Sequence, residues 1–155
     1  MKNKLDISFH VHNDLWKTRL RPYTKTVQMV LENALLDTKL KNEKSVFEIA
    51  VVLADDAFVK DLNSQYRGKN KPTNVLSFPA SPQTTELGDI VLALETIEKE
   101  AKEQKKTFRN HTIHLLTHGF LHLIGYDHMD KKQAGIMEKI EIKALKKLGV
   151  SNPYL

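Results

Sequence analysis

Five of the seven histidines in this chain fall within positions 111–128. His118 and His122 are four residues apart, so on a helix they lie within about 40° of each other on one face. His128 follows Gly125, a residue that can end the helix and turn the chain back. Three imidazoles without cysteine leave one tetrahedral position for water, which is typical of a catalytic zinc site. The spacing therefore predicts a metal centre of His118, His122 and His128.

Spacing alone also allows these histidines to have roles that involve no metal. A helix with several histidines can present a polar face, and single histidines can be satisfied core residues. The spacing is also that of zinc peptidases, but residue 119 is Gly, where those enzymes carry a Glu that acts as general base. His114 would close the site as a fourth ligand, so we expect it to support a ligand or contact substrate. Asp127 or Asp130 can fix an imidazole tautomer, although Asp130 can equally cap a helix.

The elements that position these residues follow from the hydrophobic periodicity. Apolar alternation predicts a strand over residues 5–11, and a near-continuous apolar run predicts a central strand, covered on both faces, over 46–53. Two further strands are expected over 74–78 and 88–94. Helical spacing predicts helices over 22–35, 56–67, 95–106, 108–124 and 130–148. This order predicts an α+β fold, a small, mostly four-stranded mixed sheet with helices packed on it, and the metal site at the end of the long helix in the C-terminal half.

Composition limits the class of protein. The chain has 155 residues, 41% of them apolar, with 24 Lys and Arg against 19 Asp and Glu, a net charge of +5. This length predicts a single domain over residues 1–155, and the apolar fraction excludes a disordered chain. The absence of cysteine excludes disulfides, a thiol nucleophile and Cys-ligated zinc. No apolar run approaches the roughly 18 residues of a membrane helix, and no export signal is visible. We therefore expect a cytoplasmic protein that does not bind membranes, and the charge favours an anionic partner.

Several segments of the sequence resemble one known family. Residues 118–128 read His-Gly-Phe-Leu-His-Leu-Ile-Gly-Tyr-Asp-His, which resembles the signature H-G-x-L-H-L-x-G-Y-D-H of the YbeY family of bacterial rRNA maturation and quality-control endoribonucleases. Residues 63–67 and 72–79 are similar to its N-x-x-Y-R and P-T-[DN]-V-L-S-F-P segments, and residues 88–90 to its G-D-[IL] strand. Only the first forty or so residues carry no signature.

The resemblance implies a zinc-dependent endoribonuclease. One Zn²⁺ per chain would be held by His118, His122 and His128, and Arg67 would be important for activity. The family implies a single-strand-specific enzyme that acts in 3′ end maturation of small-subunit (16S) rRNA and in ribosome quality control. The expected partners are rRNA and the small ribosomal subunit or its assembly proteins, with no role for DNA.

These roles lead to expectations for individual side chains. We expect His118 and Arg67 to be catalytic, with the planar fork of Arg67 on the scissile phosphate. Lys69 and Lys71 would follow the RNA backbone, and His114 would contact RNA or serve as general base. A structural salt bridge at a helix end is the alternative for Arg67.

Two further points stay open. An aromatic side chain can stack on a base, although core packing is the favoured role for each of the three candidates, Tyr66, Phe78 and Tyr126. The alternative functions are a non-catalytic zinc-containing ribosome assembly factor and a zinc peptide hydrolase.

Overall fold

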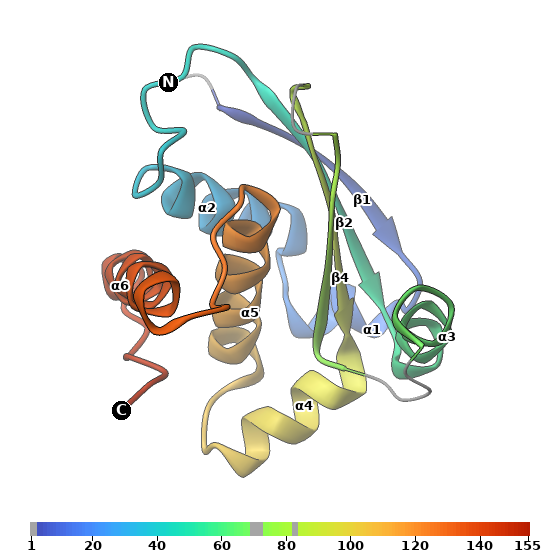
Figure 1. Cartoon of the computed structure of the whole chain (residues 1–155). Coiled ribbons are helices and arrows are strands. Elements are labelled where there is room, and N and C mark those ends of the chain that lie inside the picture. The colour runs from blue at the N-terminus through green and yellow to red at the C-terminus, as the bar shows by residue number, and fades with distance from the viewer. Residues whose placement is uncertain (1–2, 69–72, 82–83) are drawn as a thin grey trace.

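The computed structural model describes residues 3–68, 73–81 and 84–155. Within them the chain forms one four-stranded sheet and six helices (Figure 1). In chain order these are β1 (Leu5–Val11), α1 (Leu15–Arg19), α2 (Tyr23–Leu35), β2 (Phe47–Ala54), α3 (Asp56–Arg67), β3 (Val75–Pro79), β4 (Glu86–Ala93), α4 (Leu94–Glu103), α5 (Phe108–Leu123) and α6 (Lys131–Lys147).

The sheet is mixed, as the sequence predicts. Its strand order is β1-β2-β4-β3, with β1, β2 and β4 parallel and β3 antiparallel to β4. The predicted α+β fold is therefore confirmed, and β2 is an interior strand. The prediction that β2 is covered on both faces is wrong, because Glu48 is exposed and Ala50 and Val52 are only half-buried. Figure 1 shows the reason, since α2 and α5 lie on one face of the sheet and α3 covers only one end of the other.

Helix α5 runs through the middle of the protein. It packs against α2, α4, α6 and the strands β3 and β4, and Figure 1 shows it between the sheet and the outer helices. Leu116 and Phe120 are fully buried, as expected for a helix that is covered on most sides. This packing fixes the position of every side chain that α5 contributes to a site. No helix in the described part of the chain has the length and apolarity needed to cross a bilayer.

Two elements differ from the expected ones. Helix α1 was not expected, since five residues are too few to show a helical period. Its Trp16 is nevertheless fully buried and donates its indole N–H to the carbonyl oxygen of Ala54 at 2.8 Å. Helix α4 ends at Glu103 rather than at 106, because Lys105 takes a positive φ of 57° that a helix does not allow.

Gly119 lets α5 approach the sheet closely. A Cβ at this position would lie 3.1 Å from Ser77 Oγ, 3.2 Å from Val75 Cγ2 and 3.3 Å from Ile90 Cγ2. The Ser77 hydroxyl also donates to the Gly119 carbonyl oxygen at 3.1 Å. Position 119 therefore faces strands β3 and β4, and it has no room for the glutamate of a zinc peptidase.

We expect Gly119→Glu to destabilise the fold by more than about 3 kcal/mol, because it forces a charged side chain into a packed contact. Gly135→Glu is the matched control, since Gly135 lies in α6 and an added Cβ there would have no heavy atom within 4 Å. The control should be neutral or stabilising, because Gly is a poor helix former. Urea unfolding measures both changes, and equal stabilities of the two variants would contradict the packing argument.

Candidate functional site

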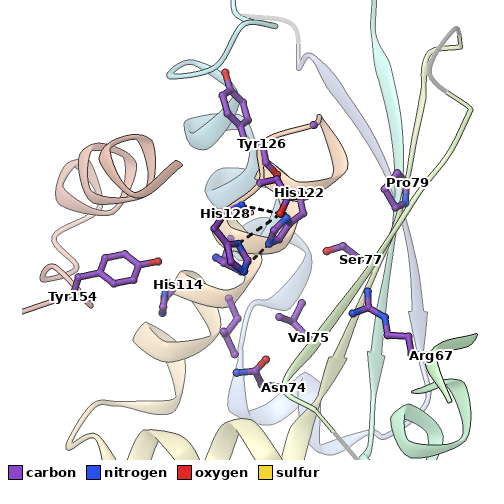
Figure 2. A pocket seen from close by; sticks show the side chains of 14 residues that line it. Arg67, Asn74, Val75, Ser77, Pro79, His114, His122, Tyr126, His128 and Tyr154 are labelled. Carbon is purple, nitrogen blue, oxygen red and sulfur yellow. Dashed lines mark hydrogen bonds and ion pairs between the residues drawn. The ribbon is translucent and has the colours of Figure 1, made fainter. Parts of the chain in front are cut away.

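One cleft collects most of the residues singled out in the sequence. It has a volume of about 720 Å³ and lies between α5, β3, the end of α3 and the C-terminal residues (Figure 2). Its lining consists of Arg67, Asn74, Val75, Ser77, Pro79, His114, Leu115, His118, His122, Gly125, Tyr126, Asp127, His128 and Tyr154.

The three histidines of the predicted metal centre come together in this cleft. Their nearest ring nitrogens all lie within 4.8 Å of one another. His118 and His122 are half-buried on α5, and His128 is exposed in the loop that follows. Gly125 makes that loop possible, because its φ of +100° is one that other residues rarely adopt. The predicted turn at Gly125 is confirmed.

The tautomers of two of these imidazoles follow from their partners. The Nδ1–H of His122 donates to the carbonyl oxygen of Tyr126 at 3.1 Å, and the Nδ1–H of His118 donates to the carboxylate of Glu141. Carbonyl and carboxylate oxygens only accept, so in the neutral rings the proton is on Nδ1 and the lone pair is on Nε2.

These lone pairs make a site for a cation. The two Nε2 atoms of His118 and His122 are 3.1 Å apart. Two acceptors at this distance repel each other unless a proton or a metal ion lies between them. Tetrahedral zinc with Zn–N bonds of about 2.0–2.1 Å places two ligand nitrogens about 3.3 Å apart. The donor set and its spacing therefore fit zinc.

Glu141 is a site residue that the sequence did not reveal. It is fully buried on α6, and its second carboxylate oxygen accepts the hydroxyl hydrogen bond of Tyr154. Burial alone raises the pKa of Glu141, but the hydrogen bond and charge of His118 and the Tyr154 hydroxyl outweigh it and hold that pKa below its usual value. The available signal is its place on the apolar stripe of α6, four residues from both Met137 and Leu145.

The carboxylates expected to fix an imidazole tautomer do not do so in the described part of the chain. Asp130 caps α6 by accepting the backbone N–H of Gln133 at 2.8 Å. Asp127 accepts the backbone N–H of His128, and its Oδ1 is 3.9 Å from Nδ1 of that ring, beyond hydrogen-bond distance. The carboxylate that accepts the Nδ1–H of His118 is instead that of Glu141.

His114 lines the cleft one turn before His118. Both of its ring nitrogens are buried and have no hydrogen-bond partner within the described residues. Burial is the main effect that lowers the pKa of His114, and the nearby Lys106 adds to it. The resulting pKa is about 4, despite the opposing effect of Glu141. Burial and the neighbouring imidazoles of His118 and His128 also lower the pKa of His122. Both rings are therefore neutral at pH 7.

The low pKa of His114 predicts a loss of stability in acid. Between its ordinary value of 6.5 and about 4, the unfolded chain binds a proton at this ring that the folded chain does not. Stability should therefore fall as pH falls through this window, by about 2 kcal/mol at pH 5 relative to pH 7. Urea unfolding of the metal-free protein at the two pH values measures the effect. His114→Leu should show a smaller pH dependence, and an unchanged one would contradict the assignment.

Arg67 lies across the cleft from the imidazoles (Figure 2). It is the last residue of α3, and its side chain is exposed. Among residues 3–68, 73–81 and 84–155 its side chain forms no ion pair or hydrogen bond, so the salt-bridge alternative is not supported there. The expected RNA contacts Lys69 and Lys71 lie outside the described residues.

Asn74 is a further cleft residue with a fixed orientation. Its amide Nδ2 donates to Glu100 Oε1 at 2.9 Å, and buried His111 reaches the same oxygen through Nε2 at 2.9 Å. The amide oxygen of Asn74 is therefore the atom left to accept a hydrogen bond from a bound molecule.

The three aromatic candidates for base stacking have different surroundings. Tyr66 is 68% exposed, so the favoured core role is wrong for it, and its ring lies edge-on to Phe78 with the centroids 5.6 Å apart. Phe78 is partly buried in the small apolar cluster next to α3. Tyr126 packs against the main core and accepts the backbone N–H of Lys39 at 3.2 Å. Tyr66 is thus the most exposed of the three, whereas Tyr126 is the one that lines the cleft.

The fold and the cleft define an α+β protein in which three imidazoles and an arginine line one cleft of about 720 Å³. The chain belongs to the endoribonuclease YbeY family, whose model, described as "Endoribonuclease YbeY", matches residues 10–149. This match confirms the resemblance seen in the sequence and the prediction that the protein is a nuclease.

Individual relatives agree with this membership. A protein named endoribonuclease YbeY from Rhizobium etli is 43% identical over 97% of this chain and 94% of its own length. Another of the same name from Methylocella silvestris is 45% identical over 99% of this chain and 87% of its own. The solution structure of TM1509 from Thermotoga maritima has a TM-score of 0.58 at 24% identity, covering 93% of this chain and 92% of that one. This last likeness supports the fold.

Proposed function

We propose that this protein is a single-strand-specific, zinc-dependent endoribonuclease, built as one domain over residues 1–155. The observation that carries the proposal is the cleft in which His118, His122 and His128 face Arg67. Membership in the endoribonuclease YbeY family supports the choice of RNA as substrate. The reaction is hydrolysis or transesterification of a phosphodiester bond.

The chain's residues divide the work of binding and reaction. His118, His122 and His128 would hold one zinc ion through their ring nitrogens. When bound, zinc supplies a Lewis acid that attracts a phosphate oxygen and makes a bound water more acidic. Arg67 places its planar fork on the phosphate from the opposite wall and stabilises the charge that develops there. His114, neutral at pH 7, is available to accept a proton.

The biological substrate that we propose is rRNA of the small ribosomal subunit, cleaved in 3′ end maturation of 16S rRNA and in ribosome quality control in the cytoplasm. The net charge of +5 favours binding of a polyanion. The described residues contain no element that reads an RNA sequence by itself, so the small subunit or its assembly proteins would supply the cleavage site. DNA and membranes are not expected partners.

A zinc peptide hydrolase is the weaker alternative. Gly119 packs against the sheet, where the peptidases of similar spacing have their general base. A non-catalytic assembly factor with a structural zinc is the other alternative, and it predicts no cleavage at all.

The test is the metal content of the purified protein together with its action on three substrates: a single-stranded RNA oligonucleotide, the same sequence as DNA, and casein. We expect one zinc per chain and cleavage of the RNA alone, abolished by a chelator and restored by zinc. Zinc without cleavage would favour the assembly factor, and cleavage of casein alone would favour the peptidase. Either result would overturn the proposed function.

A further inference from the structure

Glu141 is a fully buried acidic residue, so its neighbours must stabilise its charge. Its carboxylate is completely buried, and burying an ionised group is unfavourable unless every oxygen is paired. Its partners are neutral or weakly basic groups, namely the imidazole of His118, the hydroxyl of Tyr154 and, at 3.9 Å, the imidazole of His114. In the described part of the chain no lysine or arginine forms an ion pair with it.

The contact with His118 indicates a role for Glu141 in metal binding. A carboxylate that accepts Nδ1–H fixes the ring orientation and keeps the lone pair on Nε2, the atom that faces His122 at 3.1 Å. A negative charge at Nδ1 also makes Nε2 a stronger electron donor to a cation. His122 has only a backbone carbonyl in the same place, so His118 is the more strongly supported of the two α5 ligands.

Tyr154 connects the end of the chain to this pair. Its hydroxyl donates to Glu141, and its ring lies edge-on to His114 with the centroids 6.1 Å apart. Burial and the adjacent carboxylate of Glu141 raise the pKa of Tyr154, so the hydroxyl keeps its proton and remains a donor. In Figure 2 the Tyr154 side chain extends from the C-terminal segment towards the imidazoles. Residues near the C-terminus thereby form part of the wall of the cleft.

We propose that Glu141 and Tyr154 are positioning residues of the metal centre: Glu141 orients His118 and strengthens it as a ligand, and Tyr154 holds the Glu141 carboxylate in place. The inference rests on the proposed metal-binding function of the three histidines. It assigns a role in metal binding to α6 and to the C-terminal residues, which contribute none of the three proposed histidine ligands.

The test is the affinity of the metal-free protein for Zn²⁺, measured by competition with a chromophoric chelator, together with its melting temperature. Glu141→Gln keeps the volume of the side chain and removes its charge. Zinc affinity should fall by about 10–100-fold, while the metal-free protein stays folded with a lower melting temperature, because the carboxylate that accepts from His118 and Tyr154 is gone. Glu103→Gln is the control, since it removes the same charge from an exposed position on α4. The control should keep its zinc affinity.

Tyr154→Phe tests the second half of the proposal. It should lower zinc affinity by less than Glu141→Gln does, because the carboxylate remains but is no longer held. The double variant should bind zinc no more weakly than Glu141→Gln alone, since Tyr154 acts through Glu141. Independent, multiplying effects of the two changes would overturn the role given to Tyr154.

The outcomes separate this inference from the proposed function. If the unaltered protein binds no zinc, the proposed function and the inference are both overturned. If it binds zinc and Glu141→Gln binds it equally well, only the inference is overturned. A melting temperature that falls in Glu141→Gln with unchanged zinc affinity would assign Glu141 to fold stability alone.

Discussion

His118→Ala should abolish zinc binding and RNA cleavage together. Loss of a hydrogen-bond partner behind a ligand already costs about 10–100-fold in metal affinity, so removal of the ligand itself should cost more than about 100-fold. Only two imidazoles, those of His122 and His128, would remain of the group whose nitrogens lie within 4.8 Å of one another. Zinc content after dialysis and the cleavage rate of a single-stranded RNA oligonucleotide measure the two effects.

His118→Ala also removes the hydrogen-bond partner of the buried Glu141 carboxylate. A second variant separates the loss of zinc from the loss of stability. His118→Ala leaves Glu141 without its imidazole donor, so the fold should lose stability as well. The side chain of His128 is 58% exposed, and His128→Ala should lose zinc and cleavage with little change in melting temperature. His10→Ala, on the exposed surface of β1, is the control for a histidine outside the site. Full cleavage by His128→Ala would contradict the three-ligand centre.

Sequence reasoning found the parts of the site that depend on residues close together in the chain. His118 and His122 share a helix face because they are four residues apart, and Gly125 allows the turn that returns His128 to them. Strand β1 follows from apolar alternation and β2 from a near-continuous apolar run, and the cap of α6 follows from Asp130, whose side chain accepts the backbone N–H of Gln133 in the first turn.

What sequence reasoning missed depends on contacts between distant segments. Asp127 and Asp130 are near the histidines in the chain, but Glu141 reaches His118 across 23 positions because α6 packs against α5. A carboxylate on an apolar helix stripe indicates such a role only when the facing helix is known. The exposed outer face of β2 was missed for a similar reason, since an apolar run does not say which helices will cover it.

The position of Arg67 opposite the histidines depends on the topology of the sheet. Strand β3 pairs with β4 in antiparallel orientation, and α5 packs on β3 through Gly119. Together these contacts bring the end of α3 and the histidines to opposite walls of one cleft. The sequence contains both residues, but only this topology makes them neighbours.

We expect Arg67→Ala to lose RNA cleavage while zinc stays bound. Removal of one donor that stabilises developing charge costs about 10²–10³-fold in rate, and the guanidinium supplies two donors to a phosphate. Because the Arg67 side chain is exposed and has no ion-pair partner in the described part of the chain, the melting temperature and the zinc content should not change. Single-turnover cleavage of a single-stranded RNA oligonucleotide, with zinc analysis of the same samples, measures these properties.

Two further variants show whether the fork or the charge of Arg67 matters. Arg67→Lys keeps the charge but offers a point charge in place of the planar fork, so it should recover only part of the rate. Lys60→Ala removes an exposed cation from the same helix α3 and should cleave RNA at close to the unaltered rate. If Arg67→Ala lost zinc or unfolded, Arg67 would be structural. If the unaltered protein cleaves and Arg67→Ala cleaves equally fast, the phosphate is bound elsewhere in the cleft.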